Sequence, residues 1–125
     1  PALELAEVNN PYDEWIGADI RSDAFAYIAP AYPEKAASMA YYDAYISHRR
    51  NGIYGEMFFA AAQSAAFAVD NSVDALEIGL TEIPKDCSLA NLTTGTINPS
   101  GTATATPICT WLFMRRLSSN HCELN

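Results

Sequence analysis

The chain has 125 residues, about half of them apolar, which suffices for one small domain with a hydrophobic core. Its net charge of −8 excludes nucleic acid as a general partner, because no broad basic surface is available to replace phosphate counterions. No apolar run is long enough to span a bilayer and no secretory signal is visible, so we expect no membrane partner. Because the first residue is Pro1, we expect a processed or partial sequence.

The first predicted helix covers residues 11–28, after a turn-like Asn9-Asn10 pair, because proline is tolerated in a first helical turn. Trp15 and Ile28 are among its expected buried residues. Asp19 and Asp23 are four residues apart and so share one face of this helix. Two such carboxylates can coordinate a hard cation or hold ribose hydroxyls, but with Arg21 between them a solvated face is the favoured interpretation.

The second helix begins at Pro33, with a face of small alanines that lets helices approach closely. The Asn51-Gly52 pair is predicted to end it. A third helix over residues 53–69 is apolar almost all round, which indicates the central buried helix.

Asn71 or Ser72 is predicted to cap a fourth helix, which Pro84 stops. The breaks are expected near residues 29–32, 50–52 and 70–72. Short connections between helices favour a compact all-α, multi-helix array, and we expect no strand within residues 33–83.

The composition changes at residue 91. Seven of the eight threonines lie in residues 91–125, which carry one acidic and two basic residues, against 14 acidic and 5 basic in residues 1–90. We therefore divide the chain into a helical core, residues 1–90, and a distinct tail, residues 91–125. The tail is either a loop followed by a short strand or helix over residues 109–117, or a segment foreign to the fold.

The three cysteines, Cys87, Cys109 and Cys122, are an odd number at spacings that fit no metal motif. A reduced, cytoplasmic setting is the expectation.

His48 is the sharpest candidate for chemistry. It stands near the end of the second helix, beside a glycine-containing turn and close in sequence to Glu56. A neutral imidazole can hydrogen-bond a ligand from either nitrogen, although a single histidine is more commonly a structural residue. Arg49 and Arg50 could pair with a diphosphate, but a role in complementing the helix C-terminus is favoured.

Three segments carry a resemblance to a known family: EWIGADIRSDAFAYIAP, PEKAASMAYYDAYISHRRNGIYGEMFFAAAQSAAF and DALEIGLTEIP. They resemble the ADP-ribosylglycohydrolases, the family of the dinitrogenase-reductase-activating glycohydrolases and the J crystallins. The likeness covers roughly residues 9–90, is strongest over residues 43–56 and does not extend to the tail.

The resemblance implies an all-α fold and hydrolysis of the glycosidic bond that joins ADP-ribose to a protein side chain or a small molecule. It also implies two Mg²⁺ ions, held by a Thr-Asp-Asp segment near the N-terminus and an Asp-x-Asp-Thr segment near the C-terminus. Neither motif occurs in the 125 residues. The chain therefore resembles the middle of such an enzyme, with no catalytic or metal-binding residue of its own.

The resemblance also implies a substrate-binding wall. His48 matches the family histidine that lines the ADP-ribose site, and residues 17–21 resemble a Gly-x-x-x-Arg loop beside the ribose and phosphates. Gly17, Arg21 and Asp23 thus join His48 as expected binding residues. Ala26 and Ala31 stand where the resemblance predicts glycine.

Two functions follow as expectations. The first is a fragment of an ADP-ribosyl hydrolase that supplies part of the ADP-ribose site and is inactive alone. The second is a non-catalytic helical module of the same fold that binds a ligand or a partner, because fold alone does not decide function.

Overall fold

The computed structural model describes residue 4 and residues 6–97. The regular elements in this part of the chain are helical, in the order η2 (Asp19–Arg21, a 3-10 turn), α1 (Ser22–Ile28), α2 (Pro33–Tyr45), α3 (Asn51–Ala65), α4 (Ser72–Thr81) and α5 (Ser88–Thr96). Residues 33–83 contain no strand. The all-α prediction is therefore confirmed for the part of the chain that the structure describes.

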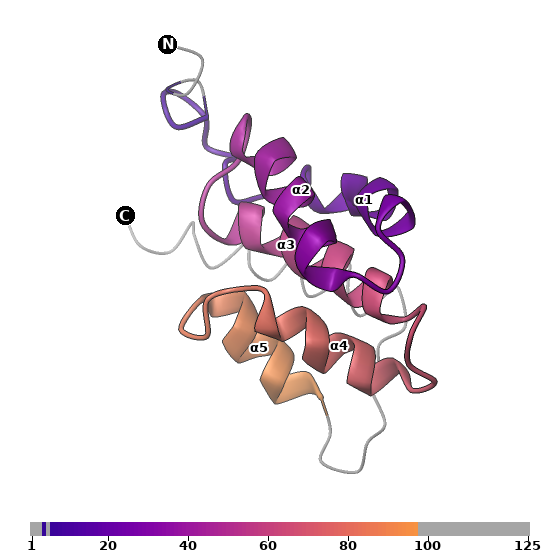
Figure 1. Ribbon diagram of the computed structural model, residues 1–125. Helices are drawn as coiled ribbons and strands as arrows, with labels where there is room; N and C mark the ends of the chain where they lie inside the picture. The colour runs from indigo at the N-terminus through magenta and orange to yellow at the C-terminus, as the bar shows by residue number, and fades with distance from the viewer. Residues whose placement is uncertain (1–3, 5, 98–125) are drawn as a thin grey trace.

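Helix α3 is the centre of the array. Helices α1 and α2 pack on one side of it and α4 and α5 on the other (Figure 1). Ten of its fifteen residues are buried. The expectation of a central, mostly buried third helix is confirmed.

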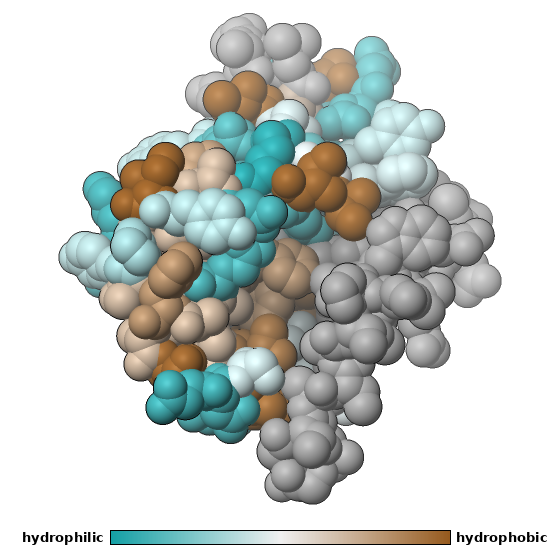
Figure 2. All heavy atoms as spheres, turned by 90° about the vertical axis from the view of Figure 1, so that its right-hand side faces the viewer, coloured by the Kyte–Doolittle hydropathy of each residue, from teal (hydrophilic) through white to brown (hydrophobic). Residues whose placement is uncertain are grey.

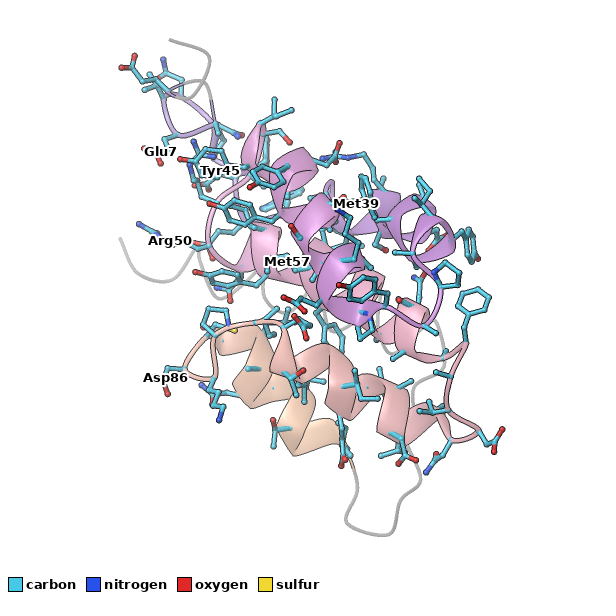
Figure 3. All side chains as sticks on the ribbon, in the orientation of Figure 1. Glu7, Met39, Tyr45, Arg50, Met57 and Asp86 are labelled. Atoms are coloured by element: carbon cyan, nitrogen blue, oxygen red, sulfur yellow. The ribbon has the colours of Figure 1, made fainter. Side chains whose placement is uncertain are left out.

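Small side chains set the distance between α2 and α3. Ala36, Ala40 and Ala60 are fully buried in one cluster between the two helices. Close approach of this kind needs residues without bulk beyond Cβ. Met57 extends from α3 into the clusters on both sides, and Figure 3 labels it between α2 and the α4–α5 pair. One flexible side chain thus links the apolar clusters.

The prediction of one helix over residues 11–28 is wrong for its first half. Residues 11–18 form turns, because Asn10 Oδ1 accepts the Tyr12 N–H at 3.1 Å and the Asp13 carbonyl accepts the Arg49 N–H at 2.8 Å. These groups bond outside any helical ladder. Two residues expected to be buried are exposed: Trp15, which lies in the turns, and Ile28, which is the last residue of α1. Ala26 is the fully buried residue of α1.

The boundary between the second and third helices also differs from expectation. Helix α2 ends at Tyr45, and Asn51 and Gly52 are the first residues of α3 rather than a stop signal. The chain turns at Arg50 instead, which has a φ of 45°. Glycine is needed at position 52 for space, because a Cβ there would lie 2.5 Å from the Asp13 carbonyl oxygen.

The C-terminal half follows the predicted pattern more closely. Helix α3 ends four residues before the predicted Val69. Asn71 caps α4 by accepting the Val73 N–H at 3.0 Å, and α4 ends before Pro84. The change of composition at residue 91 falls inside α5, whose Leu89 is fully buried against α3. The rest of the predicted tail, including residues 109–117, Cys109 and Cys122, lies outside the described residues.

None of the helices within the described residues is both long and apolar enough to cross a membrane.

Candidate ligand site

Three of the four residues that the sequence singles out converge at one corner of the array. Arg21 Nη1 donates to the Gly17 carbonyl at 2.9 Å, and a Cβ on Gly17 would lie 3.1 Å from His48 Nε2. Gly17 and Arg21 come from the turn before α1, whereas His48 comes from the connection after α2. The absence of a side chain at position 17 therefore lets the imidazole lie against the turn.

His48 is held in place on both sides. Its backbone N–H donates to the Ala44 carbonyl at 2.8 Å, and its Nδ1 lies 2.7 Å from Ser47 Oγ. The residue is only 8% exposed. Burial, and then the charge of Arg21, lower the pKa of His48 below its usual value, so the ring is neutral at pH 7. A neutral ring offers one donor and one acceptor, with Nε2 directed at the Gly17 turn.

Carboxyl groups surround Arg21 beneath this corner. Arg21 Nε donates to Asp43 Oδ2 at 2.5 Å, and its Nη2 lies 3.7 Å from Glu56 Oε2. Glu56 is fully buried, and Asp19 is 7% exposed. Gly55 is required here, because a Cβ at this position would overlap the Asp19 carboxylate. The turn, α2 and α3 thus each contribute one acid.

The buried acids are short of partners. Asp19 Oδ1 and both carboxyl oxygens of Glu56 make no hydrogen bond. Burial, and then the neighbouring charge of Glu56, raise the pKa of Asp19 to about 8. Burial, and then the charge of Asp43, raise the pKa of Glu56 to about 8 as well. Both groups are therefore mainly protonated at pH 7 and can donate as well as accept. The prediction that Asp19 belongs to a solvated face is wrong.

The two arginines after His48 have separate roles. Arg49 Nη1 donates to the carbonyls of Tyr45 and His48, at 2.5 and 2.7 Å, and so satisfies the end of α2. That confirms the favoured interpretation for Arg49. Arg50 lies 3.4 Å from Glu14 through Nη1 and is exposed.

Asp23 has different neighbours from the other three expected binding residues. It is exposed on α1, and its Oδ1 accepts a hydrogen bond from Gln63 Nε2 at 2.7 Å. Asp23 is not among the groups that the structure shows in contact with Gly17, Arg21 or His48.

The donor set does not fit the Mg²⁺ ions that the resemblance implies. The described residues contain no group of three or more acidic, histidine or cysteine side chains arranged to hold a metal. Asp43 and Glu56 are two acids on neighbouring helices, but the Arg21 guanidinium lies between them and repels a cation.

Sequence reasoning missed Asp43 and underestimated Asp19. The one available signal was the pair of glycines, Gly52 and Gly55, near the start of an otherwise apolar helix. Glycine is costly inside a helix, so it indicates close approach by another part of the chain. The spacing of the two glycines did not show which side chains pack against them.

Comparisons of the chain with protein-family models, with curated proteins and with solved structures find no match.

Proposed function

We propose that this chain forms part of the ADP-ribose site of a hydrolase that cleaves the glycosidic bond of ADP-ribosylated proteins or small molecules. The observation that carries the proposal is the meeting of Gly17, Arg21 and His48 from segments 27 or more residues apart. These are three of the four residues that the resemblance to the ADP-ribosylglycohydrolases assigns to such a site.

Of the two alanines that depart from the resembling pattern, Ala31 keeps a backbone conformation that the pattern's glycine would also adopt. Ala31 has a φ of 59°, in the left-handed region that favours glycine, and Ala26 is fully buried. The Ala31 backbone therefore has a conformation that a glycine fits. Alanine is the smallest side chain that can replace it.

In this proposal the residues of this chain bind and orient the ligand. The neutral His48 ring hydrogen-bonds the ligand through Nε2, at the Gly17 turn. Mg²⁺, when bound by segments outside this chain, would supply the electrostatic stabilisation of the reaction. No catalytic step is assigned to the 125 residues, and incubation with an ADP-ribosylated substrate and Mg²⁺ is expected to release no ADP-ribose.

A calorimetric titration with ADP-ribose tests the proposal. His48→Ala should weaken binding by roughly two- to tenfold, since one hydrogen bond contributes about 0.5–1.5 kcal/mol. His48→Gln, which keeps a donor and an acceptor, should retain more of the affinity. Lys35→Ala, at an exposed cation near the start of α2 and so at the far end of that helix from His48, is the matched control and should bind as the unchanged chain does.

Folding of each variant is checked by thermal unfolding, because His48 is buried. No ADP-ribose binding by the unchanged chain, or equal affinity in His48→Ala, would contradict the proposal.

The alternative is a non-catalytic helical module, and the complete burial of Glu56 favours it. In that case the acids and Arg21 serve to fix the turn against α2 and α3. The complete coding sequence discriminates: a Thr-Asp-Asp segment before the chain and an Asp-x-Asp-Thr segment after it support the enzyme, and absence of both supports the module.

A further inference from the structure

A second site lies between α1 and the end of α3, separate from the cluster around Arg21. It is a pocket of about 400 Å³ lined by Asp23, Tyr27, Gln63, Ala66 and Phe67. Helix α1 and the C-terminal end of α3 lie on the right of Figure 1, the side that Figure 2 turns toward the viewer. Apolar and polar side chains are interleaved on that face (Figure 2).

The pocket has a polar end and an aromatic end. Asp23 and Tyr27 are four residues apart on α1, and Gln63 and Phe67 are four apart across the end of α3, so each pair lies on one face of its segment. Gln63 Nε2 donates to Asp23 Oδ1 at 2.7 Å, and the rings of Tyr27 and Phe67 meet edge to face with centroids 6.3 Å apart. These two contacts across the helices bound the pocket.

The lining selects a cation with an apolar stem. Tyr27 is 66% exposed and Phe67 58% exposed, so their rings are available to a ligand. Both ring faces carry negative charge density, which attracts a cation, and the Asp23 carboxylate keeps free lone pairs beside its bond to Gln63. No basic side chain is among the lining residues that the structure describes.

We propose that this pocket binds an alkylammonium group, presented by a lysine side chain of a partner polypeptide. The ammonium donates to Asp23 while the methylene stem lies on Tyr27 and Phe67. Four residues of helix advance about 6 Å, which is of the same order as the length of a lysine stem. The net charge of −8 attracts a basic partner. The inference does not rest on the ADP-ribose proposal and gives Asp23 a role apart from it.

The test is an NMR titration of the isotopically labelled chain with N-acetyl-lysine methylamide. We expect saturable shifts of the Gln63 side-chain amide and of the Tyr27 and Phe67 ring resonances. N-acetyl-norleucine methylamide has nearly the same stem without the ammonium, and it should produce much smaller shifts at these positions.

Asp23→Asn should weaken lysine-amide binding roughly threefold or more, and Phe67→Leu roughly two- to fivefold. Asp70→Asn, which removes the charge of another exposed acid, is the matched control and should bind as the unchanged chain does. Equal binding of the norleucine amide, no saturable shift, or an unaffected Asp23→Asn variant would overturn the proposal. Saturable binding of free butylammonium but not of the lysine amide would overturn the polypeptide source.

Discussion

Ala31, in the break between α1 and α2, has a backbone conformation that is unfavourable for alanine. Its φ of 59° brings the methyl group close to the backbone, so tertiary contacts must hold the residue in this conformation. The Ala31 N–H donates to the Ser64 carbonyl at 2.9 Å, and Ser64 Oγ donates to the Ala29 carbonyl at 2.5 Å. The break between α1 and α2 is thus fastened to the end of α3.

We expect Ala31→Gly to raise the free energy of unfolding by up to about 1 kcal/mol. A non-glycine residue in the left-handed region costs about 1–2 kcal/mol, and the extra chain entropy of glycine offsets about 0.5–1 kcal/mol of that gain. Ala24→Gly, at an exposed helical position in α1, is the control and should lower it by about 0.5–1 kcal/mol. Urea unfolding measures the free energy of unfolding of both variants. A decrease in Ala31→Gly equal to the decrease in Ala24→Gly would contradict the prediction.

At the scale of elements, the packing of α2 on α3 depends on residues too small to drive burial alone. Ala36, Ala40 and Ala44 are all fully buried on the same side of α2. Each alanine removes little apolar surface from water. The interface therefore stabilises the fold mainly through van der Waals contact between two closely packed backbones. Such an interface tolerates no added volume.

Ala40→Leu should therefore lower the free energy of unfolding by about 1–3 kcal/mol, since added methylenes force helices apart. Ser38→Leu, at an exposed position of the same helix, adds similar bulk and should change it by no more than about 0.5 kcal/mol. Denaturant unfolding of the two variants compares them. A similar, small effect in both would show that the interface is not closely packed.

At the scale of the whole molecule, stability is linked to pH through the buried acids. Asp19 and Glu56 have ordinary pKa values of 3.8 and 4.5, and about 8 in the fold. Between these values the folded chain binds more protons than the unfolded chain. Their contribution to stability is therefore fully present below about pH 4 and is lost as the pH rises through about 8.

We expect the free energy of unfolding to fall between pH 5 and pH 9 by an amount on the order of a few kcal/mol, since one pKa unit corresponds to about 1.4 kcal/mol. Glu56→Gln keeps the shape of the side chain without its titration and should flatten this dependence. Urea unfolding at several pH values, followed by tryptophan fluorescence, makes the measurement. A rise in stability over this range, or an unchanged slope in Glu56→Gln, would contradict the assignment.

The sequence by itself determined the helical class, the approximate breaks, a cap at Asn71 or Ser72 and the central position of α3, because propensity, proline, caps and apolar periodicity are local properties. It also singled out Gly17, Arg21 and His48, which the fold brings together. Only the tertiary structure decided that Asp19 is buried, that Asp43 and Glu56 flank Arg21, and that Asp23 faces Gln63. Such contacts join residues about 20 to 40 positions apart, and a one-dimensional pattern does not specify their partners. The turns of residues 11–18 depend in part on such a contact, since the Asp13 carbonyl accepts the N–H of the distant Arg49.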